Sequence, residues 1–373
     1  MRVLIFGTYD VSSHPRVGII AEGLRAHGHD VRECNVPLGL DTAARVKMLA
    51  QPWRVPLLLV TLSRRWLRLA RQARAHPRPD VVVVGYLGHF DVHLAKLLHR
   101  RVPIVLDHLI GASDTARDRR LSGGIRQPLL RMIDAAALRA ATIVVVDTDE
   151  HLASLPEEHR GQAVVIPVGA PKSWFHETID PVPRNGNTTL RVVFYGLYTP
   201  LQGTVAIGEA LGRLADDPRI EVTMIGGGQD EPEARRSAAA NKSVTWIDWI
   251  PAAELPTLVA AHDVCLGIFG TGPKALRVVP NKVYQGAAAG CAIVTSDTAP
   301  QRRAFGDAAV LVAPGDPAAL AAALVRLAGD PDELVRMRRA ARDVAQSRFI
   351  PARVVDPLVE RLDRHERHEH GEN

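Results

Sequence analysis

Short apolar runs alternate with helix-like stretches along the whole chain, which is the pattern of parallel α/β sheets. The run Val81-Val82-Val83-Val84 has no polar alternation, as expected of a strand that is covered on both faces. Twelve such runs predict strands, six in each half of the chain. They cover residues 2–6, 30–33, 81–85, 104–106, 143–146 and 164–166, and then 191–195, 221–225, 244–246, 264–268, 292–295 and 309–312.

The stretch from Pro167 to Asn187 separates the two sets of strands. It holds four prolines together with Gly186 and Asn187, which is the composition of a linker. A chain of 373 residues also suits two domains better than one core. We therefore predict an N-terminal domain over residues 1–180, a C-terminal domain over 187–350, and a final helix over 351–373. In open sheets of this kind, ligands bind at the carboxyl ends of the strands.

The overall composition is that of a soluble globular protein, with 46% apolar and 23% charged residues. No apolar run approaches the length of a membrane span, and the chain begins on a strand-like segment, so we expect no signal peptide. Cys34, Cys265 and Cys291 lie in apolar settings, which predicts buried thiols in a reducing, cytoplasmic compartment. No zinc spacing and no Ser-His-Asp arrangement emerges, and we expect no metal.

One segment is strongly basic. Between Thr42 and Pro79 the chain has nine Lys or Arg residues, from Arg45 to Arg78, and no Asp or Glu. Three interpretations remain open: a solvated arginine-rich helix, a patch for an acidic substrate, and a weak contact with an anionic membrane surface, which would place the protein at the periphery of the inner membrane. Nucleic acid is not favoured, because aromatic residues are few and no recognition motif is present.

The choice of lysine over arginine is informative at one place. Only six of the 46 cationic residues are lysines, yet Lys274 and Lys282 lie close together in a Gly-, Pro- and Asn-rich stretch. The compact ammonium suits a phosphate oxygen. A run of small residues follows and leads into the apolar run Ala292 to Thr295. A helix start beside two cations, before a buried strand, suggests a cradle for a nucleotide diphosphate.

Polar residues also follow two strands of the first half. Asp107 and His108 follow the run 104–106, where a parallel sheet presents side chains to a ligand. Asp114 either joins them or caps a helix. Gly7 allows close approach of the backbone to a ligand, and His14 can face the same site.

These motifs, taken in order, resemble the GT-B glycosyltransferases, and in particular the retaining family 4 (glycosyl transferases group 1), which includes sucrose synthase. The resemblance rests on segments spread over nearly the whole chain. They are Phe6-Gly7-Thr8-Tyr9, Ser13-His14-Pro15-Arg16, Val193-Phe194-Tyr195-Gly196, Ile225-Gly226-Gly227-Gly228-Gln229, Trp249 to Pro256, and Gln285 to Val294.

The resemblance implies two Rossmann-like domains that face each other across a cleft, with a nucleotide sugar in the second domain and the acceptor in the first. The final helix commonly packs back on the first domain, and no cofactor is needed beyond the donor substrate. The residues implied in donor binding are Gly7, Tyr198, Gln202, Gly226, Gly228, Trp249, Ile250, Arg277, Asn281 and Gln285. Those implied in catalysis are Asp107, His108, Lys274 and Lys282, and those on the acceptor side are His14 and Asp114.

The chain also departs from the family pattern. Two glutamates usually contact the donor sugar and the ribose, but their positions are occupied by Arg277 and Gln285. The usual Arg and Lys after the glycine at position 196 are missing, so Lys274, Arg277 and Lys282 are the candidate cations for a diphosphate.

The sequence therefore predicts a hexosyltransferase that moves a sugar from a nucleotide diphosphate donor to a small-molecule or envelope-glycan acceptor, with retention. The arginine-rich, lysine-poor composition suggests a bacterial source of high GC content. Two alternatives remain: a non-catalytic partner that binds a nucleotide sugar, and a nucleotide-sugar epimerase.

Overall fold

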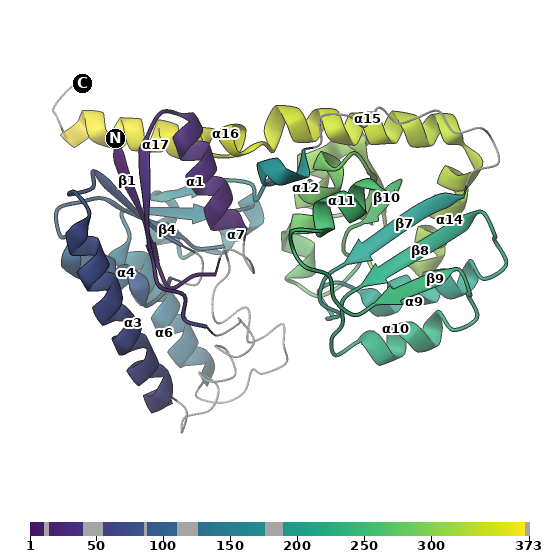
Figure 1. Ribbon diagram of the computed structural model, residues 1–373, viewed down its shortest axis with the longest axis horizontal. Helices are drawn as coiled ribbons and strands as arrows, with labels where there is room; N and C mark the ends of the chain where they lie inside the picture. The colour runs from purple at the N-terminus through teal and green to yellow at the C-terminus, as the bar shows by residue number, and fades with distance from the viewer. Residues whose placement is uncertain (11–14, 40–54, 86–87, 110–125, 176–188, 370–373) are drawn as a thin grey trace. The chain divides into compact units, whose positions relative to one another are not determined.

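The computed structural model describes residues 1–10, 15–39, 55–85, 88–109, 126–175 and 189–369. The chain forms two compact units (Figure 1). The N-terminal unit comprises Met1–Pro167 and Pro351–Asn373, and the C-terminal unit comprises Val168–Ile350. The division falls at the start of the proline-rich stretch, because the residues after Pro167 pack with the second unit. The amide of Ala170, for example, donates to the carbonyl of Phe349 at 3.0 Å.

The N-terminal unit is built on a six-stranded sheet with the order β2-β1-β3-β4-β5-β6, in which every pairing is parallel. Its strands are β1 (Arg2–Gly7), β2 (Asp30–Asn35), β3 (Val81–Val84), β4 (Ile104–Asp107), β5 (Ile143–Val146) and β6 (Ala163–Val165). The four residues of β3 are all buried, as the unbroken valine run predicts.

Helices cover both faces of this sheet (Figure 1). One face packs against α3, α4 and α6, and the other against α1, α16 and α17. The described residues of the unit form the helices α1 (Arg16–Ala26), α3 (Val55–Ala75), α4 (Asp91–Leu98), α6 (Arg126–Ala140), α7 (Asp149–Ser154), α8 (Glu157–Arg160), α16 (Pro351–Val354) and α17 (Asp356–Glu369).

The end of the chain completes the core of the N-terminal unit. Val354, Val355, Leu358 and Leu362 are buried in one cluster with the residues of α1 and with alternate residues of β1, β3 and β5. Gly23 of α1 permits the contact, because a Cβ there would lie 2.3 Å from the carbonyl oxygen of Pro351. Residues more than three hundred positions apart therefore share one hydrophobic core.

The C-terminal unit repeats the plan with a second parallel sheet, in the order β12-β11-β10-β7-β8-β9. Its strands are β7 (Leu190–Tyr195), β8 (Ile220–Ile225), β9 (Val244–Ile247), β10 (Val264–Leu266), β11 (Ala292–Ser296) and β12 (Ala309–Val312). Its helices are α9 (Thr204–Arg213), α10 (Glu231–Ser237), α11 (Leu255–Ala260), α12 (Asn281–Ala288), α13 (Ala299–Phe305), α14 (Pro317–Gly329) and α15 (Pro331–Arg348), with short 3-10 turns at Lys172–Trp174, Ala275–Arg277 and Gly306–Ala308.

All twelve predicted strands are present, and their ends differ from the prediction by at most two residues. The predicted α/β fold with two parallel, Rossmann-like sheets is thus confirmed. In each unit the strand order reverses beside the first strand, between β1 and β3 and between β7 and β10. Such a reversal creates a crevice at the carboxyl ends of the strands, and the candidate site residues lie at these ends. Among the described residues, no helix combines the length and the apolar character that crossing a bilayer requires.

Candidate functional site

In the C-terminal unit, the loops that follow β7 and β8 are pressed together. Gly226 adopts a φ of 113°, and a Cβ at this position would lie 2.0 Å from the carbonyl oxygen of Gly196. The amide of Tyr198 donates to the carbonyl of Gly227 at 3.0 Å. Glycine is therefore required at position 226 both by its backbone conformation and by the approach of the neighbouring loop.

The loop after β10 is joined to the loop after β7 in the same way. The amide of Phe269 donates to the carbonyl of Gln202 at 3.0 Å, and a Cβ on Gly203 would lie 2.4 Å from the carbonyl carbon of Phe269. Three strand ends thus share one network of backbone contacts, and this network holds the backbone of Gln202.

Lys282 contacts this network through its side chain. It is the second residue of α12, and only 5% of its surface is exposed. Its Nζ donates to Oε1 of Gln202 at 2.6 Å and lies 3.6 Å from the centre of the Phe194 ring. A Cβ on Gly196 would be 3.2 Å from this Nζ, so the ammonium lies at the carboxyl end of β7.

The buried ammonium has no acidic partner among the described residues. Burial lowers the pKa of Lys282 to about 7, and the glutamine and the aromatic face contribute only neutral, electron-rich groups. α12 begins at Asn281, and the residue before it, Pro280, provides no side-chain cap, so Lys282 belongs to the uncapped first turn of the helix. This arrangement is suited to an anion.

Gln285 lies one turn further along α12 and is also buried. Its Oε1 accepts a hydrogen bond from the Tyr195 hydroxyl at 3.0 Å, and the ring of Trp174 stacks on Tyr195 with a centroid distance of 5.8 Å. The amide oxygen is thus already an acceptor for protein, which leaves the amide nitrogen as the side chain's principal free group for a ligand.

The other predicted donor-site residues have different environments. The ring of Tyr198 is fully buried and stacks on Phe194, so it is part of the core, where its hydroxyl has no partner among the described residues. Trp249 is 73% exposed and Ile250 partly buried. Arg277 donates from Nε to the carbonyl of Pro273 at 3.1 Å. Lys274 immediately precedes the turn that contains Arg277, and Asn281, at the start of α12, is exposed, as is Gly228.

In the N-terminal unit, Asp107 at the end of β4 is paired with a residue that the motif analysis did not assign to the site. Nε of Arg16 lies 2.8 Å from Oδ1 of Asp107, and both side chains are almost completely buried. A second Arg16 nitrogen, Nη2, donates to the carbonyl of Ile166 at 3.0 Å. Nη1 of Arg16 and Oδ2 of Asp107 have no hydrogen-bond partner in the described part of the chain.

His108 continues this polar cluster. Its ring centre lies 5.3 Å from that of His89, whose Nε2 is 3.1 Å from Oδ1 of Asp134. Burial, assisted by the neighbouring His89, lowers the pKa of His108 to about 3, so its imidazole is neutral at physiological pH. Nδ1 of His108 is another buried polar atom without a partner among the described residues. Buried polar atoms are nearly always paired, so three unpaired ones at one strand end indicate a place for a polar ligand.

A third anchor fixes the loop after β1. The carboxylate of Asp91 accepts hydrogen bonds from the Thr8 amide at 2.7 Å, the Thr8 hydroxyl at 2.8 Å and the indole of Trp66 at 2.8 Å. A side chain at Gly7 would crowd this arrangement, because a Cβ there would lie 3.2 Å from Oδ2 of Asp91 and 3.2 Å from the ring of Tyr9. Asp91 thus holds the backbone of the loop in place.

The structure therefore brings together Lys282, Gln202, Gln285 and the glycine loops in one unit, and Asp107 and His108 in the other. It adds Arg16, His89 and Asp134, which sequence reasoning did not assign. Arg16 stands in the Ser13-His14-Pro15-Arg16 motif, and this was the one available signal. His14 and Asp114, and the segment around Arg45, lie outside the described residues.

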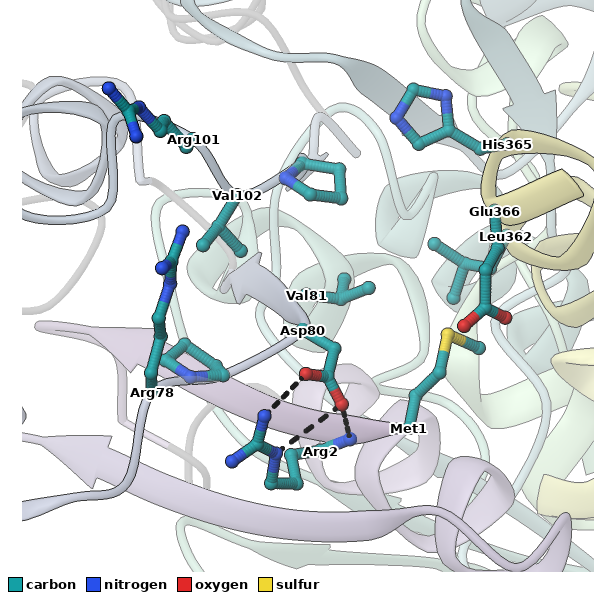
Figure 2. A pocket seen from close by; sticks show the side chains of 12 residues that line it. Met1, Arg2, Arg78, Asp80, Val81, Arg101, Val102, Leu362, His365 and Glu366 are labelled. Atoms are coloured by element: carbon teal, nitrogen blue, oxygen red, sulfur yellow. Dashed lines mark hydrogen bonds and ion pairs between the residues drawn. The ribbon is translucent and has the colours of Figure 1, made fainter. Parts of the chain in front are cut away.

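A cavity of about 430 Å³ lies elsewhere in the N-terminal unit. It is at the amino ends of β1 and β3, the edge opposite to the site residues (Figure 2). Figure 2 shows Arg2 hydrogen-bonded to Asp80 among the residues that line it, together with His365 and Glu366 of α17. The cavity is therefore distant from the candidate site residues at the carboxyl ends of the strands. No group of three metal-ligating side chains occurs in the part of the chain that the structure describes.

Comparison with known proteins supports a glycosyltransferase. Residues 189–330 match the family model described as Glycosyl transferases group 1. The fold is similar to sucrose-phosphate synthase from Thermosynechococcus elongatus, with a TM-score of 0.70, 15% identity and full coverage of both chains. It is also similar to HepE from Anabaena in complex with UDP and glucose, with a TM-score of 0.67, 15% identity and coverage of 97% of this chain and 99% of that one.

A third similar structure is that described as trehalose-6-phosphate from E. coli bound with UDP-2-fluoro glucose, with a TM-score of 0.67, 13% identity and coverage of 97% of this chain and 99% of that one. At these identities the likeness establishes the fold, which is GT-B. No curated protein sequence matches the chain.

Proposed function

We propose that this chain, which carries a glycosyl transferases group 1 domain on a GT-B fold, transfers a sugar from a nucleotide diphosphate sugar to an acceptor hydroxyl, with retention of configuration. The acceptor is a small molecule or an envelope glycan. The observation that carries the proposal is the buried, carboxylate-free ammonium of Lys282 at the carboxyl end of β7.

The donor diphosphate is assigned to Lys282 and the first turn of α12. A buried cation is costly unless it is paired, and a diphosphate provides the missing negative charge. The amides at the start of a helix favour the same ligand. Gly196 leaves room for it, because a Cβ at this position would lie 3.2 Å from Nζ of Lys282. Arg277, in the short turn Ala275–Arg277 before α12, and Lys274, which immediately precedes that turn, are the further candidate cations.

The reaction places few demands on protein groups. The bond between the anomeric carbon and the diphosphate oxygen breaks, and a bond from the acceptor oxygen to the same carbon forms on the same face. The departing phosphate oxygen can take the acceptor's proton, so no protein base is needed. Catalysis then rests on positioning and on stabilising the negative charge of the leaving diphosphate, which is the role proposed for Lys282.

The acceptor is assigned to the polar cluster at the end of β4. Oδ2 of Asp107 accepts a hydrogen bond, Nη1 of Arg16 donates one, and the neutral imidazole of His108 can do either. Because His108 is neutral at physiological pH, it orients hydroxyls and does not act as a general acid. A sugar, which carries adjacent hydroxyls, satisfies donors and acceptors of both kinds.

UDP sugars are the first donors to test, because two of the similar structures hold UDP or a UDP sugar. A cytoplasmic location is proposed from the three cysteines, all of which are free and buried. A second candidate function, a non-catalytic protein that binds nucleotide sugars, is favoured by one observation. The two positions of the family's glutamates hold Arg277, which bonds to the Pro273 carbonyl, and Gln285, which bonds to Tyr195.

The test is a donor-consumption assay with UDP-, GDP-, ADP- and dTDP-sugars, each with and without a panel of sugar, sugar-phosphate and polyol acceptors. NMR of the product gives the anomeric configuration. The proposal predicts acceptor-dependent release of one nucleotide diphosphate and a product with the donor's configuration. Donor binding without turnover would favour the non-catalytic protein, and conversion of the donor sugar without any acceptor would favour an epimerase.

A further inference from the structure

The exposed charged residues on the outer side of the α3–α4–α6 layer are all positive. These cations come from all three helices, and we call them the cationic helix face. They are Arg64, Arg68, Arg71 and Arg74 of α3, Lys96 of α4, and Arg131 and Arg139 of α6. The three helices cover the same face of the sheet, and Nζ of Lys96 lies 3.4 Å from the carbonyl oxygen of Arg139, which joins α4 to α6.

No exposed acidic residue offsets these charges on the three helices. Their only acidic residues are Asp91 and Asp134, which are buried and contact Thr8, Trp66 and His89 inside the unit. The helices on the opposite face of the same sheet differ, because α16 and α17 mix both signs. Their charged residues include Arg353, Asp356, Glu360, Arg361, Asp363 and Arg364. The single sign is thus a property of one face and not of the whole unit.

Aliphatic side chains are exposed among these cations. Val60 and Leu67 of α3, Leu97 of α4 and Met132 of α6 are 49%, 61%, 58% and 58% exposed. They make up half of the exposed large hydrophobic residues in the described part of the chain, and the other four lie in the C-terminal unit. Leu67 stands between Arg64 and Arg71 at helical spacing, so apolar and cationic groups share one stripe of α3.

The arginines of α3 also repel one another. Arg64 and Arg68 are four residues apart, and Arg68, Arg71 and Arg74 follow at steps of three, so each lies on the surface next to a like charge. None of the four has an ion-pair partner among the described residues. A partner that carries many negative charges at the surface would relieve this repulsion.

We propose that the cationic helix face docks the N-terminal unit on an anionic lipid bilayer. The guanidinium groups of the arginines pair with the anionic lipid headgroups, and their aliphatic stems lie along the membrane interface. Leu67, Leu97 and Met132 reach the boundary between the headgroups and the acyl chains. A nucleic acid would pair with the cations but would not use the aliphatic side chains. Among the described residues of the three helices no Phe, Tyr or Trp ring is exposed for stacking, since the indole of Trp66 is turned inward to Asp91.

The test is co-sedimentation of the full chain with vesicles of phosphatidylcholine alone and with vesicles that also contain phosphatidylglycerol. We expect binding to the second kind only, weakening with added salt. The variant Arg68→Glu/Arg71→Glu should lower the vesicle partition coefficient at least about 25-fold, because removing one arginine from the headgroup layer weakens binding roughly fivefold. Leu67→Ser/Leu97→Ser should weaken the binding that persists at high salt.

The matched control is Arg336→Glu/Arg339→Glu on α15. It makes the same change of charge at exposed arginines of the C-terminal unit, and its binding should equal that of the wild type. Melting of Arg68→Glu/Arg71→Glu should occur at or above the wild-type temperature, because the new glutamates pair with arginines. Equal loss in both charge variants, no binding by the wild type, or equally tight, variant-sensitive binding to a DNA duplex would overturn the proposal.

Discussion

Nζ of Lys282 donates a hydrogen bond to Oε1 of Gln202 at 2.6 Å, although the two residues are 80 positions apart. One comes from the start of α12 and the other from the loop after β7, and that loop is fixed by the bond between the Phe269 amide and the Gln202 carbonyl. The partner is a neutral amide, so the positive charge at this strand end is oriented but not neutralised. In the proposed function, the donor diphosphate neutralises the charge of Lys282.

Donor affinity should depend on pH through this lysine. A diphosphate binds the protonated form of Lys282, and burial sets the pKa of the free group at about 7. The affinity for a nucleotide sugar should therefore be constant below pH 7 and fall about tenfold per pH unit well above it. Calorimetric titration with UDP-glucose measures this without interference, since its diphosphate has no terminal phosphate group that ionises near pH 6. A flat profile between about pH 6 and 9 would contradict the assignment.

The same pKa shift predicts how the stability of the protein depends on pH. Lys282 has a pKa of about 7 in the folded protein and 10.5 in an exposed lysine, so between these values the unfolded chain binds more protons. Stability should rise with pH across this window, and the full cost of burying the charge is present below pH 7. Lys282→Met should remove the rise and gain on the order of 1–4 kcal/mol at pH 6. Urea unfolding of both proteins at several pH values tests it, with the exposed Lys242→Met as control.

Glycine at position 226 should be indispensable. Gly226→Ala would place a methyl group 2.0 Å from the Gly196 carbonyl oxygen at a φ of 113°, so the two loops must separate. We expect a loss of about 2 kcal/mol or more in stability together with loss of nucleotide binding. Gly272→Ala is the matched control, because nothing lies within 4 Å of a Cβ there. Thermal unfolding and nucleotide titration of the two variants should differ sharply. Similar behaviour would mean that the loop contact is not tight.

Replacing one member of the buried Arg16–Asp107 pair should destabilise the protein strongly, whereas replacing both with apolar residues should cost much less. Asp107→Leu alone leaves a buried guanidinium without its carboxylate and should cost about 3–5 kcal/mol. The double variant Arg16→Met/Asp107→Leu should recover most of that stability while transfer activity stays lost, because the polar atoms assigned to the acceptor site are gone. Urea unfolding and donor consumption separate the two effects. Recovery of activity in the double variant would show that the pair is purely structural.

The strands could be predicted from the sequence because their apolar runs are short and uninterrupted. Asp107 and His108 could be singled out because they directly follow such a run, and Lys282 because lysines are rare in this chain. These signals are local. They rest on residues next to each other, and the parallel sheet then determines where the strand ends lie.

The remaining features depend on contacts between distant residues. Arginine is usually a surface residue, and nothing near Arg16 in the sequence indicates that it is buried against Asp107, 91 positions away. His89 and Asp134 approach each other only because α4 and α6 pack side by side. Tyr198 follows a glycine loop, as a ligand contact would, but its ring fills the core beside Phe194. The environments of these residues depend on how helices and strands pack together, and the order of residues along the chain does not predict that packing.

The most direct measurement is the change in melting temperature of the wild type and of Lys282→Met with UDP, GDP, ADP and dTDP, each at about 100 times its expected dissociation constant. We predict that one nucleotide stabilises the wild type by about 2.7 kcal/mol, that Lys282→Met responds to none, and that Lys242→Met responds as the wild type does. No shift with any nucleotide, or an equal shift in Lys282→Met, would contradict the assignment of the donor diphosphate to this lysine.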